Sequence, residues 1–316
     1  MLYISDDHFK DIPVYWNETI SQIGKAISCM ATGDFSQPMK PYLRFKDKSN
    51  RIIAMPSYVG GNIDMAGIKW IASFPKNIEN NLPRASSVTV LNNTNTGVPI
   101  AIFNTPMISV IRTASVSGYL LREYNLFKQK PTYNIGIIGF GPIGQYHLKM
   151  CKDVLNETIG GICIYDKKVN KVPDDSILVC DSWQEVYEKS DVFITCTSSL
   201  ERYIDLPTQS NKLMLDVSLR DFKEEAMDSF TKPFIVDDWD EVNRENTDIE
   251  YYFNLGKISK NEIITLCDIQ NKKMHEYYED YDTIYFAPMG MSIFDITIAN
   301  YYYQLALEKD FGIILN

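Results

Sequence analysis

The sequence has few of the residues that mark metal sites, disulfide frameworks and membrane segments. Its 316 residues include only three histidines and six cysteines, and no two cysteines are spaced as CxxC. Isolated histidines leave no recognisable zinc or iron site. Because several cysteines lie inside apolar runs, we expect reduced, buried thiols in a cytoplasmic protein, and no metal.

The sequence also shows no pattern typical of a targeting signal or of a membrane-spanning segment. The first residues, MLYISDDHFK, contain no basic region followed by an apolar stretch, and no window of about 18 apolar residues occurs. With 31 basic and 41 acidic residues the net charge is −10, which argues against nucleic acids and anionic membranes as partners. Any anionic ligand must therefore be held by a local cluster of cations.

The chain does have enough apolar residues, 45%, to bury one or two cores, and its length predicts about two domains. After a short helical start, strands are predicted at 51–59 and 65–74. A hairpin follows, in which SVTVLN and VPIAIFN flank the turn NTNTG. A helix is predicted from Pro106 to about Tyr124, because Thr105 suits the N-cap and Pro106 the first helical position.

From Tyr133 onward, short apolar strands alternate with helices, as in an α/β fold with a parallel sheet. The strongest motif here is GFGPIG at 139–144, a GxGxxG placed directly after a strand and directly before a helix. In a Rossmann fold these glycines allow a tight turn, approach of the pyrophosphate and close helix packing. Asp166 ends the next strand, 22 positions after Gly144, where its carboxylate would accept hydrogen bonds from ribose hydroxyls.

These features predict a dinucleotide site. The residues expected to form it are Gly139, Gly141, Pro142, Ile143, Gly144, Asp166, Thr195, Cys196, Thr197 and Met289, with 195–197 at the nicotinamide end. The Asp166 carboxylate would repel a ribose 2′-phosphate, which favours NAD over NADP. Lys167 and Lys168 weaken that inference, either as a solvated patch or as a phosphate clamp. The segment between Asp166 and Ile177 is too short for a regular crossover helix.

Three cations are embedded among apolar or small neighbours: Arg44 in PYLRF, Lys69 in GIKWI and Arg112 in SVIRTA. Each is either a snorkelling or internally paired side chain or a ligand contact. Three of them in one β-rich domain favour the carboxylate of an amino acid as a ligand. Asp221 follows another Rossmann strand, where it is either a general base or the N-cap of a helix beginning near Phe222.

The motifs resemble those of the ornithine cyclodeaminase/mu-crystallin family over nearly the whole chain. The resemblance is carried by PYLRF, RIIAMPSYVGG, GIKWI, VPIAIFN, ISVIRTASVSGYL, GFGPIG, DVFITCTSS, VDDWDEVNRE and APMGMSIFDI. Within the family, MPSYVGG, VDDWDEVNRE and PMGM are most similar to the branch that makes 2,3-diaminopropionate.

That resemblance implies NAD-dependent oxidative hydrolysis of N-[(2S)-2-amino-2-carboxyethyl]-L-glutamate to L-2,3-diaminopropionate and 2-oxoglutarate. It assigns Asp221 and Lys69 as catalytic residues, and Arg44, Lys69 and Arg112 as substrate-binding cations. We expect a Rossmann domain over 119–292. A substrate-binding and dimerisation domain of α+β type is expected over 1–118, with 293–316 returning to it. The active site is expected in the cleft between these domains of a homodimer.

Arg84 is added to the substrate-binding residues because the implied substrate has three carboxylates; the alternative for this residue is a surface ion pair. The chain departs from the family pattern in lacking a helix after the second Rossmann strand, and in having Phe294 before Asp295 where an acidic residue is common. Three alternatives stay open. They are an ornithine cyclodeaminase, a ketimine reductase and a non-catalytic protein that binds NAD(P) and a small ligand.

Overall fold

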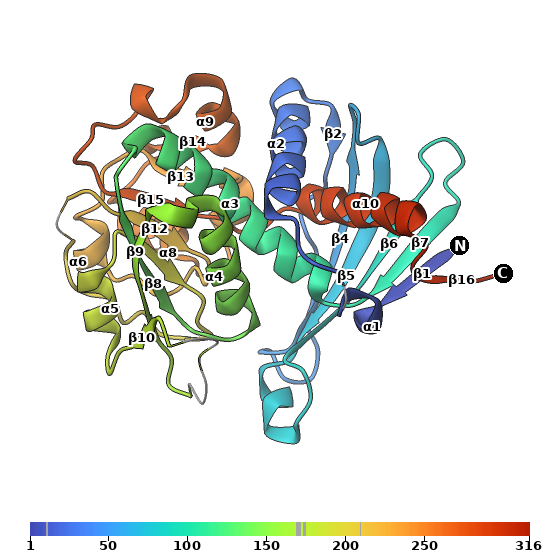
Figure 1. Ribbon diagram of the computed structural model, residues 1–316, viewed down its shortest axis with the longest axis horizontal. Helices are drawn as coiled ribbons and strands as arrows, with labels where there is room; N and C mark the ends of the chain where they lie inside the picture. The colour runs from blue at the N-terminus through green and yellow to red at the C-terminus, as the bar shows by residue number, and fades with distance from the viewer. Residues whose placement is uncertain (11, 169–171, 173–174, 209) are drawn as a thin grey trace. The chain divides into compact units, whose positions relative to one another are not determined.

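The computed structural model describes residues 1–10, 12–168, 172, 175–208 and 210–316 (Figure 1). The chain forms two compact units, one made of residues 1–115 and 290–316 and the other of residues 116–289. The division falls within helix α3 (Met107–Lys128). The boundaries predicted from the sequence, 118/119 and 292/293, lie three residues further along the chain at each junction.

The first unit is a mixed sheet with helices packed on it. Its strands are β1 (Leu2–Ser5), β2 (Phe35–Ser36), β3 (Tyr42–Leu43), β4 (Arg51–Val59), β5 (Met65–Ser73), β6 (Ala85–Asn92), β7 (Pro99–Asn104) and β16 (Ile313–Ile314). Its helices are α1 (Asp6–Phe9), α2 (Trp16–Thr32), the start of α3 (Met107–Lys128), α10 (Ser292–Lys309) and the short η1 (Pro75–Asn80). The strand order is β16-β1-β7-β6-β5-β4-β2, with β3 also paired to β4.

Local chemistry explains the central hairpin of this sheet. Strands β6 and β7 pair antiparallel, as predicted. In the turn between them, the Asn93 side-chain oxygen accepts hydrogen bonds from the N–H groups of Asn95 and Thr96, and Gly97 has a positive φ of 71°. Asparagine and glycine tolerate these turn conformations, so β6 ends here and the chain reverses direction into β7.

Helix α10 covers one face of the sheet. Figure 1 shows it in red across β4, β5 and β6, and it also packs against α2. The predicted helical start is longer than expected, because α2 runs for 17 residues and buries Ile20, Ile23 and Ile27 on one face before ending at the left-handed Gly33. The C-terminal segment thereby supplies core to a unit built mostly from the first hundred residues.

The second unit is a parallel sheet of the Rossmann type. Its strands are β8 (Tyr133–Ile138), β9 (Ile159–Tyr165), β10 (Ile177–Val179), β11 (Val192–Thr195), β12 (Leu213–Asp216), β13 (Phe234–Val236), β14 (Ile263–Thr265) and β15 (Ile284–Ala287). Its helices include α4 (Pro142–Leu155), α5 (Trp183–Lys189), α6 (Glu224–Met227), α7 (Trp239–Val242), α8 (Asp248–Asn254) and α9 (Leu266–Lys272).

The order of the strands matches a dinucleotide-binding sheet. It runs β10-β9-β8-β11-β12-β15-β13-β14, and the paired strands are parallel. In the order of the chain this is 3-2-1-4-5 for the first five strands, which is the Rossmann arrangement. The predicted α/β fold class is confirmed. The prediction that no regular helix lies between β9 and β10 falls largely on residues 169–171 and 173–174, which lie outside the described part.

Candidate functional site

The glycine-rich loop follows β8 and opens α4. Gly139 has a φ of 85°, and a Cβ at this position would lie 2.5 Å from the Cys196 carbonyl oxygen. A Cβ on Gly144 would lie 2.1 Å from the Gly139 carbonyl oxygen, so α4 packs against the loop as closely as backbone allows. A Cβ on Gly141 would meet nothing within 4 Å. The first and third glycines are therefore needed by the fold, whereas the second faces open space.

The first turn of α4 begins beside the open space at Gly141. Gly141 is the N-cap, and Pro142 and Ile143 begin the helix. Proline is favoured at this position because its fixed φ suits a helix and its missing N–H needs no partner there. The first N–H groups of a helix have no acceptor within the helix. This arrangement suits the phosphates of a dinucleotide.

Asp166 follows β9 and holds the loop. Its carboxylate accepts hydrogen bonds from the Phe140 N–H at 2.7 Å and from the Lys168 N–H at 2.8 Å. Lys168 thus contacts Asp166 through its backbone. The side chain stands beside the glycine-rich loop, where the sequence predicts the adenosine ribose.

The predicted nicotinamide residues follow β11. The Cys196 N–H donates to the Ile138 carbonyl at 2.7 Å, which joins this segment to the glycine-rich loop. Burial and the nearby Asp221 carboxylate raise the pKa of the Cys196 thiol well above its usual value, so this cysteine is a neutral thiol at physiological pH. The Met289 N–H donates to Asp237 at 3.0 Å, and Met289 packs at the edge of the Rossmann core.

Asp221 is fully buried beside these residues. One carboxylate oxygen accepts a hydrogen bond from the Thr197 hydroxyl at 2.7 Å, and the other accepts one from the Ser218 hydroxyl. It does not cap a helix, because α6 begins at Glu224 with Lys223 at the N-cap. The N-cap alternative considered from the sequence is therefore wrong.

Two further buried carboxyl groups, those of Asp248 and Asp216, lie near Asp221, and the sequence analysis did not identify them. Asp248 accepts hydrogen bonds from the N–H groups of Asp221 and Phe222, at 2.8 and 2.9 Å, and pairs with the Arg202 guanidinium at 2.6 Å. Asp216 is completely buried, and burial and its carboxylate neighbours raise its pKa well above the usual value. The backbone at Asp221 is consequently held by the buried carboxyl group of Asp248.

The first unit contains a buried group of cations around one carboxylate. The Lys69 ammonium lies 2.7 Å from one oxygen of Asp295, and the Arg112 Nε lies 3.0 Å from the other. Lys69 also donates to the Ser109 hydroxyl at 3.1 Å. Lys69, Arg112 and Asp295 are all buried. Sequence reasoning identified both cations but not Asp295.

Lys40 is a third buried cation near this group. Its ammonium donates to the Gly290 carbonyl at 2.9 Å, and its charge acts on Lys69. Burial is the largest influence on Lys69 and lowers its pKa to about 7, while Asp295 opposes the shift and the charges of Arg112 and Lys40 add to it. Lys40, in QPMKPY, was not selected from the sequence. Like the three selected cations, it lies among mostly apolar neighbours.

Arg44 and Arg84 lie elsewhere in the same unit, and both are exposed. Arg44 follows β3, packs its guanidinium over the Tyr42 ring at 5.3 Å and donates to the Lys48 carbonyl at 3.4 Å. Arg84 precedes β6 by one residue, five residues from Thr89, the partner of Lys69 across the sheet. That separation is about 17 Å along an extended strand. The structure thus groups Lys69 with Arg112 and not with Arg84.

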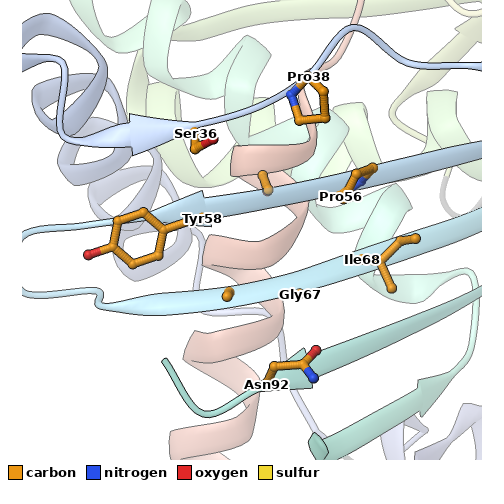
Figure 2. Close-up of a pocket in the computed structure, with 9 residues that line it drawn as sticks. Ser36, Pro38, Pro56, Tyr58, Gly67, Ile68 and Asn92 are labelled. Atoms are coloured by element: carbon orange, nitrogen blue, oxygen red, sulfur yellow. The ribbon is translucent and has the colours of Figure 1, made fainter. Parts of the chain in front are cut away.

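A hollow of about 360 Å³ opens on strands β2, β4, β5 and β6 (Figure 2). Its wall is formed by Ser36, Pro38, Pro56, Ser57, Tyr58, Ala66, Gly67, Ile68 and Asn92. No predicted site residue lines this hollow. Its lining is largely apolar and carries no charged side chain.

Comparison with known proteins places these features in context. Residues 12–310 match the ornithine cyclodeaminase/mu-crystallin family. The chain is 32% identical to the N-((2S)-2-amino-2-carboxyethyl)-L-glutamate dehydrogenase of Staphylococcus aureus, over 94% of this chain and 92% of that protein. It is 25% identical to an alanine dehydrogenase of Archaeoglobus fulgidus, again over 94% and 92%.

Among solved structures, the Δ1-pyrroline-2-carboxylate reductase of Thermococcus litoralis, in complex with NADH and L-proline, has a TM-score of 0.87. The two chains share 23% identity and cover each other completely. This likeness extends to both units, so the whole fold of the chain has a solved counterpart. Within the described part of the chain, no helix is long and apolar enough to cross a membrane.

Proposed function

Because the chain belongs to the ornithine cyclodeaminase/mu-crystallin family, we propose that it is an NAD-dependent dehydrogenase of N-[(2S)-2-amino-2-carboxyethyl]-L-glutamate. The products are L-2,3-diaminopropionate and 2-oxoglutarate. The observation that carries this substrate is the buried pair of cations, Lys69 and Arg112, which share the carboxylate of Asp295 and keep N–H groups that Asp295 does not use. Such donors on buried cations favour an anionic ligand such as a carboxylate.

The residues of the Rossmann unit fit NAD. The open space at Gly141 leaves room for the pyrophosphate against the start of α4, and Asp166 supplies a carboxylate beside the loop for the ribose hydroxyls. When bound, NAD accepts the hydride that leaves the glutamate Cα of the substrate. Asp166 favours NAD over NADP because a carboxylate repels a 2′-phosphate.

The cations of the first unit fit a substrate with several carboxylates. Lys69 and Arg112 each donate one hydrogen bond to Asp295. The ammonium has three N–H groups and the guanidinium five, so each cation keeps donors that Asp295 does not use. Arg112 can bind a carboxylate in a bidentate manner through its remaining nitrogens. With a pKa of about 7, Lys69 can also release or accept a proton near neutral pH. Arg44 stays a predicted contact for a further carboxylate of the substrate, whereas Arg84 lies too far along the sheet from Lys69 to share this substrate.

Asp221 is the proposed general base. Loss of hydride from Cα requires a neutral secondary amine, so a carboxylate must first take the amine proton. The resulting ketimine then adds water at the former Cα, and cleavage of the C–N bond gives 2-oxoglutarate and the diamino acid. The hydroxyls of Thr197 and Ser218 fix the direction of the two Asp221 oxygens, which keeps the base in one orientation for both proton transfers.

The test is a direct assay of purified protein with NAD and the glutamate–diaminopropionate conjugate. We expect NADH absorbance to rise together with equal amounts of 2-oxoglutarate and 2,3-diaminopropionate by mass spectrometry. NADP in place of NAD should give a lower kcat/KM. Absence of NADH and of both products, with protein that is folded and binds NAD, would contradict the proposal.

Parallel substrates separate the alternatives. An ornithine cyclodeaminase gives proline from ornithine with no net NADH, and a ketimine reductase consumes NADH with Δ1-pyrroline-2-carboxylate. The second alternative has support from relatives named Δ1-pyrroline-2-carboxylate reductase, at 22% identity over 99% of this chain. A protein that only binds its ligands would form no product in any of these assays.

We also propose that the chain forms a homodimer through the open face of its first sheet. Along β4 and β5, the residues that alternate with the buried Met55 and Lys69 are apolar except for Tyr58, and β6 adds Val88 and Val90 between Ser86 and Asn92. They include Trp70, which is 45% exposed. Apolar side chains on a sheet face are typical of a protein–protein interface. A solved archaeal alanine dehydrogenase with TM-score 0.82 is described as a dimer.

Light scattering on eluting protein tests the dimer. The wild type should elute at twice the mass of one chain, and Trp70→Glu should shift it toward the mass of one chain by placing a charge in the apolar interface. A wild type that stays monomeric at all accessible concentrations would refute the assignment of this face.

A further inference from the structure

Asp295 occupies an unusual place in the first unit. It lies in the first turn of α10 and is fully buried, among the apolar residues of SIFDITIAN. Its two oxygens serve different cations, since Oδ2 accepts from the Lys69 ammonium at 2.7 Å and Oδ1 accepts from the Arg112 Nε at 3.0 Å. The carboxylate therefore bridges two side chains from different elements, β5 and α3.

The bridge leaves both cations with donors to spare. Arg112 uses Nε, its inner nitrogen, so the two terminal nitrogens keep their N–H groups. Gly290 limits the other side of the guanidinium, because a Cβ at that residue would lie 2.4 Å from Nη1. The guanidinium is thus held between a carboxylate and a glycine backbone. An isolated arginine side chain would have to give up rotational freedom when it binds a ligand.

We propose that Asp295 is the positioning residue of the substrate-binding cations. It orients Lys69 and Arg112 toward the substrate carboxylates and favours the ammonium form of Lys69, without contacting the substrate itself. This inference rests on the proposed function and adds to it a residue that acts through two others.

The second part of this role follows from the charges around Lys69. Among the described residues, the charged groups that act on it are Asp295 from α10, Arg112 from α3 and Lys40 from the segment before β3. Burial and the two cations favour the neutral amine, and Asp295 favours the ammonium through its charge and its hydrogen bond. Its removal should lower the pKa of Lys69 by about one unit or more, since opposite charges at this distance shift a pKa by roughly 1–3 units.

The experiment compares Asp295→Asn, Asp295→Glu and wild type from pH 5.5 to 9. In the wild type, kcat/KM for the conjugate should have an inflection near pH 7. In Asp295→Asn the inflection should move at least one unit lower and the KM should rise at least about tenfold, as cation orientation is lost. Asp295→Glu retains the charge, so its inflection should stay near 7 while its KM rises, because the carboxylate is displaced by one methylene.

Asp191→Asn is the matched control. Asp191 is a carboxylate of the Rossmann unit paired with one lysine, Lys130, at 3.0 Å, and it contacts none of the three cations. We expect the inflection in its pH profile of kcat/KM to stay near that of wild type, and its KM for the conjugate to stay within twofold. A folded Asp295→Asn protein with the wild-type inflection and KM would overturn the proposal. If Asp295→Asn does not fold, Asp295→Glu decides, and an unchanged KM overturns it.

Failure of the proposed function is distinguished by a measurement that needs no substrate. A lysine whose folded pKa is about 7 binds fewer protons than in the unfolded chain up to pH 10.5, so the free energy of unfolding rises with pH over that window. In Asp295→Asn this rise should begin at least one unit lower than in wild type. Identical onsets overturn the role of Asp295, whereas absence of turnover by wild type overturns only the reaction.

Discussion

A substitution at Gly141 separates cofactor binding from folding. Gly141→Ala places a methyl group in space where nothing lies within 4 Å, at a residue whose φ of −70° and ψ of −171° suit alanine. The loss of N-cap preference and the reduced freedom of the unfolded chain are each about 0.5–1 kcal/mol and opposite in sign. The free energy of unfolding should therefore stay within about 0.5 kcal/mol of wild type.

The same methyl group should weaken NAD binding strongly. If the pyrophosphate lies against Gly141, the added carbon must displace it or the loop, and overpacking of this kind costs about 1–3 kcal/mol. That range corresponds to a rise in the KM for NAD of roughly 5- to 150-fold. Steady-state kinetics at saturating conjugate measure the KM, and urea unfolding measures the stability.

Gly144→Ala is the matched comparison. Its Cβ would lie 2.1 Å from the Gly139 carbonyl oxygen, so α4 must move away from the loop and the protein should lose about 1–3 kcal/mol of stability. Gly141→Ala should thus alter the KM for NAD without altering stability, and Gly144→Ala should alter both. An unchanged KM for NAD in a folded Gly141→Ala protein would refute the placement of the pyrophosphate at this residue.

Two further variants test the base and the core of the Rossmann unit. Asp221→Asn should lower kcat by about 10²- to 10⁴-fold with the melting temperature little changed, since general-base catalysis contributes that factor; a loss smaller than tenfold in kcat would exclude this carboxylate as the base. Burial lowers the pKa of His147 from 6.5 to about 4, and the unfolded chain takes up the proton first. About 3 kcal/mol of stability should therefore be lost as pH falls from 6.5 to 4. His147→Gln should flatten the dependence of the free energy of unfolding on pH, measured by urea unfolding. An equal dependence in both proteins would contradict the lowered pKa of His147.

Elements with strong local signals could be predicted from the sequence. The strand at 51–59 begins and ends as expected, and the helix predicted over 106–124 begins at Met107 and continues to Lys128. The glycine-rich motif was identifiable because its neighbours fix its context, with an apolar strand before it and a helix after it. The length of α2 was underestimated, because its apolar stripe depends on burial against α10, more than 250 residues away.

Contacts between distant parts of the chain account for what sequence reasoning missed. Asp295 meets Lys69 across 226 residues and Arg112 across 183, and Lys40 meets Gly290 across 250. No local period links such positions. Asp248 is similar, since it supports Asp221 through backbone N–H groups, which carry no side-chain signature.

One signal for Asp295 was nevertheless present. Lys69 and Arg112 were selected because a charged residue among apolar neighbours must find an opposite charge or a ligand. The same argument applies to an aspartate inside SIFDITIAN, and an acidic residue in a buried helix is the natural partner for such cations. Sequence reasoning considered each cation as a ligand contact or an internal ion pair. The structure shows that Lys69 and Arg112 have an internal partner and still retain donors for a ligand, so those two interpretations do not exclude each other.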